Sequence, residues 1–336
     1  MRTFAARHPI WTAIIAALIL AFIWSLFAIW PKGLVEVMGR KKTFVQAVFH
    51  GITLGGVYFL VASGFTLIFG LMRNVNLAHG SLFLLGGYIG YEIADSTGYW
   101  LLAFPAAFIV SAAFGLLLQI FVFRRMEGDD LRQTLVTIGI SVVAADIMRW
   151  IFGSLTTSIP TPSWLFGSMQ TFFISTVKRS GDLVYITYPI ARSVIFLAAV
   201  VIGIAMWLVL NRTRIGMMIR AGVDDRDMLS ATGARIQIVF MGVFAFGAGL
   251  AGMAGVAVGT FTGLTPGDDI KFLLTSLVVV IVGGMGSIPG AAIGALLIGL
   301  SEQVGSIYLQ SYSIVLTFLI MVIVLAFRPQ GLLGRS

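Results

Sequence analysis

The sequence predicts an all-α polytopic membrane protein with about nine to ten transmembrane or re-entrant helices and glycine-rich breaks. Of 336 residues, 58% are hydrophobic and 11% are charged, whereas a soluble globular chain carries about 25% charged residues. Apolar segments recur from residue 10 to residue 327 without a long polar block between them. The surplus apolar surface therefore has to face membrane lipid.

The apolar segments predict the individual helices, because a helix crosses a bilayer with roughly 20 apolar residues. Continuous segments of that length occupy residues 10–30 and 44–69. The first follows Arg2 and Arg7, as in a signal peptide, but its long apolar run and the lack of a small-x-small cleavage site favour an uncleaved helix. Further candidate segments occupy residues 77–91, 100–123, 135–152, 189–210, 238–258, 272–300 and 314–327.

Lys and Arg in short loops predict the orientation, since they are enriched on the cytoplasmic side. Glu92 and Asp95 suit the outer side. Alternating crossings then put residues 154–183 outside and both termini inside. The basic residues between 32 and 42 would lie outside, against the rule, unless residues 31–43 lie along the membrane interface. The cytoplasmic regions are marked by Arg124, Arg125, Arg212, Arg214, Arg220, Arg226, Arg235, Arg328 and Arg335.

The long apolar block at 272–300 is expected to break into two helices or a re-entrant pair. With both termini inside, residues 236–327 have to cross an even number of times, yet only three apolar blocks occur there. The run Gly-Gly-Met-Gly-Ser-Ile-Pro-Gly interrupts the long block, and its glycines and proline favour a turn. Gly284, Gly286 and Ser287 are therefore candidates for a translocation pathway. GxxxG spacings at 86/90, 255/259 and 290/294 indicate close helix packing at least as well.

A second polar interruption, the run Arg-Asn-Val-Asn-Leu-Ala-His-Gly-Ser starting at Arg73, separates two apolar segments. Irregular backbone at membrane depth occurs only where it is buried in protein or lines a wet cavity, and transporters use such breaks to bind substrates. Asn74, Asn76, His79 and Ser81 are the candidate pathway residues, with Asn76 also suited to cap the following helix. The alternative is a tight cytoplasmic turn in which His79 makes a structural hydrogen bond.

The loop between Asn211 and Gln237 is the candidate segment at which a partner applies force. Asp224 or Asp225 suits an N-cap and Gly233 suits a C-terminal stop, which together predict a short helix over residues 226–232. Such a helix, with apolar residues on one side, fits a groove of another protein, and the alternative is a solvated positive loop. The coupling candidates are Arg220, Asp224, Asp225, Arg226, Met228, Leu229 and Gly233.

Several classes of function lack the residues that they need. The chain has no cysteine, and its three histidines are too scattered for a metal cluster. It contains no Gly-x-x-x-x-Gly-Lys-Ser/Thr loop for ATP and no nucleophile with a base that would indicate an enzyme. Membrane topology explains the net charge of +8 better than nucleic acid does. Asp146 and Arg149 are expected to pair structurally on one helix, while Lys271 and Glu302 sit near predicted span ends and indicate no specific role.

Three motifs in the same order resemble the LivH-type permease of branched-chain amino-acid ABC importers. They are the Val-Asn-Leu-Ala-His-Gly run that starts at Val75, the loop from Arg214 to Gly233, and residues 282–291. The similarity extends from about residue 44 to residue 334. It implies an amino-terminal extension at 1–43 with an extra transmembrane helix, followed by an ABC importer permease domain at 44–336.

The resemblance further implies import by alternating access across the bacterial inner membrane. The implied partners are a second, LivM-like permease, two cytoplasmic ABC ATPases that use ATP, and a periplasmic substrate-binding protein, while this chain binds no cofactor. Branched-chain or other small amino acids are the implied substrates, and relatives that carry urea, short amides or aromatic acids keep those alternatives open. A stand-alone channel or ion-coupled carrier is disfavoured, because no carboxylate or histidine relay runs through several spans.

Overall fold

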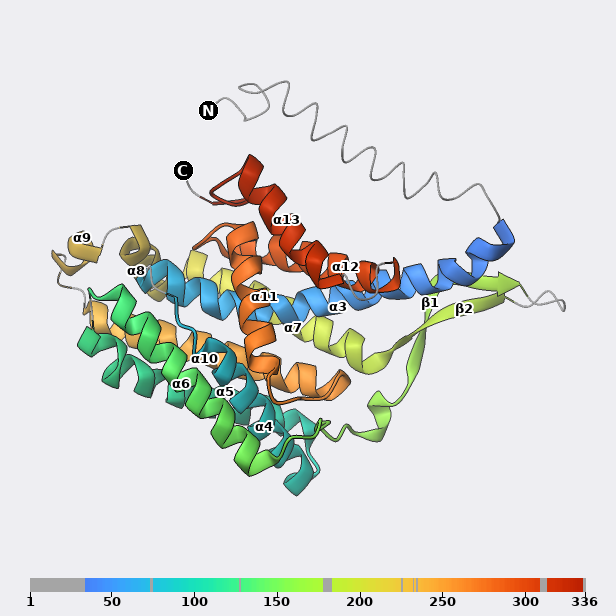
Figure 1. The fold of residues 1–336 in the computed structure, drawn as a ribbon, viewed down its shortest axis with the longest axis horizontal. Helices are drawn as coiled ribbons and strands as arrows, with labels where there is room; N and C mark the ends of the chain where they lie inside the picture. Colours follow the sequence, from blue (N-terminus) through green and yellow to red (C-terminus); the bar gives the residue numbers. More distant parts are fainter. Residues whose placement is uncertain are drawn as a thin grey trace. The chain divides into compact units, whose positions relative to one another are not determined.

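The computed structural model describes residues 34–72, 75–126, 128–177, 183–224, 226–231, 233, 235–308 and 313–334. The helix predicted at residues 10–30 lies outside this part of the chain. In chain order the elements are α3 (Leu34–Met72), α4 (His79–Thr97), α5 (Trp100–Phe121), η1 (Phe123–Met126), α6 (Asp130–Phe152), η2 (Ser163–Leu165), β1 (Ser168–Val177), β2 (Leu183–Pro189), α7 (Ile190–Arg212), α8 (Arg214–Asp224), α9 (Arg226–Ala231), α10 (Ile236–Phe261), α11 (Asp268–Gly283), α12 (Ile288–Tyr308) and α13 (Ser313–Phe327) (Figure 1).

Long apolar helices make up most of the described chain, which confirms the prediction of an all-α polytopic membrane protein. Each apolar segment predicted from residue 44 onward coincides with helix. The segment at 314–327 is apolar but shorter than a full span. Among the described residues, six helices are long and apolar enough to cross a membrane: Thr43–Gly70, Trp100–Met126, Asp130–Phe152, Ile190–Arg212, Ile236–Phe261 and Ile288–Ile307.

The apolar block at 272–300 is divided as predicted. The turn between α11 and α12 holds Gly284 and Gly286 at φ values of 106° and 78°, a region in which a Cβ atom is strained and glycine is favoured. The segment after α13 pairs with the end of α11, because the Leu332 and Leu333 N–H groups donate to its last carbonyls at 2.8 and 2.9 Å. Two helices and a turn therefore replace one long span.

The described chain forms two compact units, and the smaller one contains most of the two β-strands. It comprises residues up to Gln46 together with Thr171–Ile186. There β1 and β2 form a two-stranded sheet, and the Thr171 hydroxyl donates to the Ile186 carbonyl at 2.8 Å. The sequence reasoning assigned no strands to this region.

The larger unit has a core of α4, α5 and α10, which lie side by side (Figure 1). Glycines allow their backbones to approach closely. A Cβ atom at Gly86 would lie 2.2 Å from the Cα atom of Gly252, and one at Gly255 would lie 2.1 Å from the carbonyl oxygen of Phe83. Close approach of small residues is how helices associate where lipid removes the hydrophobic driving force. The GxxxG glycines of α4 and α10 thus serve helix packing.

From residue 47 onward, α3 passes through the interior of the larger unit. In an 18-residue stretch of its apolar portion 89% of the residues are buried, whereas the corresponding share in α6 is 11%. Gly51 and Gly55 face Leu300 and Leu296 of α12, so the numbering runs in opposite directions and the two helices are antiparallel. Large exposed apolar side chains lie on α5, α6, α7 and α13. These faces suit lipid or a second membrane subunit.

Candidate functional site

The segment before α4 is buried in the protein. Asn76 and His79 are 1% and 0% exposed, and Nε2 of His79 lies 3.2 Å from the carbonyl oxygen of Val61 in α3. The side-chain oxygen of Asn76 accepts a hydrogen bond from the Ala78 N–H at 3.0 Å, which closes a turn. The N-cap residue of α4 is Ala78, so the expectation that Asn76 caps this helix is wrong. Asn74 lies outside the described residues.

The first turns of α4 and α11 meet inside the larger unit. A Cβ atom at Gly80 would lie 2.1 Å from the carbonyl oxygen of Asp269. Since His79 contacts α3 well inside its apolar portion, both helices begin within the bundle. Three buried polar atoms here have no hydrogen-bond partner among the described residues, namely Nδ2 of Asn76, Nδ1 of His79 and Oδ1 of Asp269. Buried polar atoms are normally paired, so this junction offers unsatisfied groups to a polar ligand or water.

Ser81, the fourth candidate in this region, links two helices. Its hydroxyl donates to the hydroxyl of Ser141 in α6 at 3.1 Å. The carbonyl of the next residue, Leu82, accepts a hydrogen bond from Ser111 in α5 at 3.2 Å. The start of α4 is thus fixed by neighbours on both sides.

The second group of pathway candidates lies at the other end of α11. Gly284 and Gly286 form the turn, and Ser287 accepts a hydrogen bond from the Gly290 N–H at 3.1 Å. This bond makes Ser287 the N-cap of α12. At 1.5 Å per residue, α11 separates the turn from Asp269 by about 22 Å. The structure therefore does not bring the two groups of candidates together.

The coupling candidates lie on two consecutive short helices, α8 and α9, of which the sequence predicted only the second. Gly233, at a φ of 81°, follows the end of α9 and acts as the predicted stop. Asp224 is the last residue of α8 and Arg226 is the first of α9, so Asp224 cannot cap α9. The other candidate cap, Asp225, lies outside the described residues.

Apolar side chains of α8 and α9 are exposed. Met217 and Met228 are 54% and 69% exposed, whereas Leu229 is buried. Arg220 donates to the side-chain oxygen of Asn211 at 2.7 Å, which ties α8 to the end of α7. The two helices thus present an apolar surface while remaining attached to the bundle.

The joint between α7 and α8 is tightly packed. A Cβ atom at Gly216 would lie 2.3 Å from the carbonyl oxygen of Leu210. The Gly216 N–H donates to the Thr213 hydroxyl at 3.1 Å, so Thr213 caps α8. Glycine at this position allows α8 to lie directly against the last turn of α7.

An apolar cavity of about 380 Å³ lies between α3, α7 and α12. Small residues and aromatic side chains are among those that line it. The lining residues that matter below are Gly56, Phe59, Phe196, Gly203 and Trp207.

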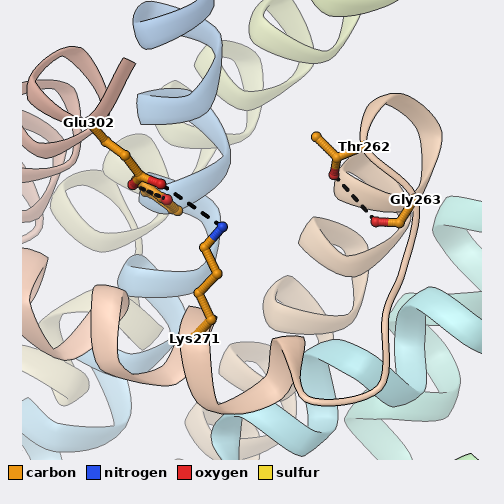
Figure 2. A network of polar contacts seen from close by, with 5 residues as sticks. Thr262, Gly263, Lys271 and Glu302 are labelled. Atoms are coloured by element: carbon orange, nitrogen blue, oxygen red, sulfur yellow. Dashed lines mark hydrogen bonds and ion pairs between the residues drawn. The ribbon is translucent and has the colours of Figure 1, made fainter. Parts of the chain in front are cut away.

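Sequence reasoning missed a polar cluster that folding assembles from three helices. Tyr58 in α3 donates to Glu302 in α12 at 2.5 Å, and the Lys271 ammonium group in α11 lies 3.9 Å from the same carboxylate (Figure 2). The signal in the sequence was a charged residue close to each end of the apolar block at 272–300. Only the turn between α11 and α12 brings Lys271 and Glu302 together.

A second missed cluster joins α3 to the segment before α7. The hydroxyls of Tyr188 and Thr53 are 2.6 Å apart, and Tyr188 donates to the Phe49 carbonyl at 3.0 Å. Burial raises the pKa of the Tyr188 hydroxyl, because the charged phenolate is poorly solvated there. Arg192 lies 5.2 Å from the ring centroid of Phe261.

The predicted pair of Asp146 and Arg149 is present on α6 with a separation of 3.4 Å, and both side chains are exposed. Among the residues that the structure describes, no group of three or more His, Cys, Asp or Glu could hold a metal ion.

Comparisons of the sequence with known proteins identify related chains. A family profile described as branched-chain amino acid transport system / permease component matches residues 47–325. The chain is 29% identical over 307 residues to the high-affinity branched-chain amino acid transport system permease protein LivH of Escherichia coli K12, covering 87% of this chain and 96% of that protein. It is 30% identical to BraD of Pseudomonas aeruginosa with the same coverage, and 25% identical to LivM of Escherichia coli K12 over 96% of this chain and 75% of that protein.

All three relatives are named as transport permeases and none as an enzyme, as the sequence led us to expect. The matched residues run from α3 into α13, and so include five of the full-length spans described above completely and the first from residue 47 onward. The chain belongs to the family of permease components of branched-chain amino acid transport systems.

Proposed function

We propose that this chain is a transmembrane permease subunit of an ATP-driven importer that carries branched-chain amino acids across the bacterial inner membrane. The observation that carries the proposal is the family match over residues 47–325. The match lies within the permease domain expected at 44–336, and residues 1–43 remain a proposed extension with a further transmembrane helix.

The proposed assembly contains a second, LivM-like permease, two cytoplasmic ABC ATPases and a periplasmic substrate-binding protein. The exposed apolar faces of α5, α6, α7 and α13 support a membrane partner. ATP is bound and hydrolysed by the partner ATPases, since this sequence has no phosphate loop.

The proposed pathway passes the start of α4. Asn74, Asn76, His79 and Ser81 belong to the break before and within this helix, and Gly284, Gly286 and Ser287 belong to the break after α11. Two helices that begin within the bundle support this assignment, because discontinuous helices present backbone and side-chain polar groups to substrates. The unpaired atoms of Asn76 and His79 add to that support.

The proposed coupling segment is α8 with α9. Exposed Met228 suits an apolar groove of an ATPase, while Arg220 ties α8 to the end of α7 and Gly233 follows the end of α9. ATPase closure pushes this segment, the push is passed to α7, and the bundle alternates between outward-open and inward-open forms.

Reconstitution of the assembled complex in liposomes tests the proposed function. We expect uptake of radioactive leucine, isoleucine and valine that requires ATP and the binding protein. Uptake by the isolated chain without ATP would instead indicate a carrier or channel. Uptake of urea, short amides or aromatic acids without branched-chain amino acids would overturn the proposed substrate.

A further inference from the structure

A carboxylate, an ammonium group and a phenol hydroxyl from three different helices meet in the larger unit. Tyr58 Oη donates to Oε2 of Glu302 at 2.5 Å. Lys271 Nζ lies 3.9 Å from Oε1 of the same residue, and Figure 2 shows the lysine side chain extending from α11 toward Glu302. Lys271 stands two positions after Asp269, whose carbonyl contacts the first turn of α4. The cluster is therefore next to the junction where α4 and α11 begin.

The two ends of this cluster are held very differently. Tyr58 is 1% exposed, and the Glu302 and Lys271 side chains are 15% and 48% exposed. Phe272 supports the cluster, since its ring lies 5.8 Å from that of Tyr58 and 5.7 Å from the lysine ammonium. One carboxylate oxygen thus accepts a hydrogen bond from a buried hydroxyl, while the other faces a half-exposed lysine.

The contact between Lys271 and Glu302 is close to the longest distance for an ion pair. An ion pair that is half exposed and this long is weak, so a ligand can separate the two groups at small cost. Glu302 lies in an apolar helix, and ionisable residues at membrane depth are costly and commonly mark substrate pathways. An uncharged ligand between the two groups would leave the largely buried Glu302 carboxylate with the Tyr58 hydroxyl as a partner but without an opposite charge, which is unfavourable.

A zwitterion removes this difficulty, because it carries one charge for each member of the pair. We propose that Glu302 binds the α-ammonium group and Lys271 the α-carboxylate of the transported amino acid, with Tyr58 as the residue that positions Glu302. The inference rests on the proposed function and deepens it. It also predicts selection against neutral molecules such as urea and short amides.

The test measures leucine uptake by the complete complex in liposomes, together with its melting temperature. Glu302→Gln and Lys271→Met should each reduce uptake by about tenfold or more, while the melting temperature stays at the wild-type value. Glu302→Asp and Lys271→Arg keep the charges and should recover part of the uptake. Tyr58→Phe keeps both charges and should slow uptake by about threefold to tenfold.

Asp146→Asn and Arg149→Gln are the matched controls, since this exposed pair lies on α6 at a similar separation of 3.4 Å. Both should transport within about twofold of wild type. Wild-type uptake by Glu302→Gln and Lys271→Met would overturn the inference. Loss of uptake together with a lower melting temperature and no recovery by Glu302→Asp would assign the cluster a structural role, which also overturns it.

If the complex with Glu302→Gln does not assemble, the Tyr58→Phe variant provides the test. Unchanged uptake by Tyr58→Phe would contradict the proposal that Tyr58 positions Glu302. A wild-type complex that carries no branched-chain amino acid would contradict the proposed function itself. That outcome is distinct from the failure of the binding pair.

Discussion

At the residue scale, the glycines between α4 and α10 set how closely two helices approach. An added Cβ atom at Gly86 would lie 2.2 Å from the Cα atom of Gly252. Backbone cannot move aside as a flexible side chain can, so the helices would have to separate. We expect Gly86→Ala to destabilise the folded chain by about 1–3 kcal/mol, measured as a lower melting temperature in detergent.

Gly139→Ala is the control for this prediction. Gly139 lies inside α6, and no atom lies within 4 Å of an added Cβ. Alanine favours helix over glycine, so this variant should melt at the wild-type temperature or slightly above it. Equal melting of Gly86→Ala and the wild type would contradict the close packing of α4 and α10.

Ser287 allows a second prediction, because its hydroxyl caps α12. Ser287→Ala removes the acceptor for the Gly290 N–H and should cost about 1 kcal/mol of stability. Ser306→Ala is the control, since Ser306 is exposed and donates only to a carbonyl of its own helix. Thermal melting distinguishes the two. A Ser287→Ala variant with unchanged stability and lost uptake would favour a pathway role over a capping role.

The sequence located candidate residues better than it located their partners. The breaks at Asn76 and Gly286 were visible because polar residues and glycines interrupt apolar runs. The pairing of Glu302 with Tyr58 and Lys271 was not visible, since it depends on how three helices pack. The available signal was a charged residue close to each end of an apolar block. Only the fold shows that these two residues meet.

At the element scale, α8 and α9 form the proposed docking surface for the ATPase subunits. Met228 is 69% exposed on α9, and an apolar anchor contributes most when a groove buries it. We expect Met228→Glu to weaken association with the ATPase subunits by about tenfold or more. Co-purification of those subunits with the tagged permease measures the loss.

Leu155→Glu is the control, because Leu155 is 83% exposed and belongs to the segment expected on the outer side of the membrane. It should leave co-purification of the ATPases unchanged. If Met228→Glu retained the ATPases and coupled hydrolysis at wild-type levels, α9 would be excluded as the docking element.

Local signals predicted some elements and missed others. The division of the 272–300 block followed from glycines and a proline, whose backbone preferences act within a few residues. The helix α8 was missed because Gly216 breaks its helical pattern, and that glycine serves contact with α7 rather than a turn. The strands β1 and β2 are stabilised by pairing with each other. A search of the sequence for membrane-spanning segments does not reveal such pairing.

At the scale of the whole molecule, the charge distribution predicts a topology that labelling can check. The chain has no cysteine, so a single introduced thiol reports without background. Asp95→Cys should react with an impermeant maleimide in intact spheroplasts. Arg235→Cys should react only after the membrane is opened. If only Arg235→Cys reacted in intact spheroplasts, the topology would be opposite to the predicted one. If both variants reacted there, the predicted number of membrane crossings between the two positions would be wrong.

The tight joint at Gly216 has a mechanical consequence for the bundle. Because α8 lies directly on the last turn of α7 with no side chain between them, a displacement of α8 in the proposed mechanism is passed to α7 without first moving side chains aside. Phe196 and Gly203 of α7 pack against Gly56 and Phe59 of α3, and all four residues line the apolar cavity. In the proposed mechanism, a movement of α7 against α3 therefore changes the shape of this cavity.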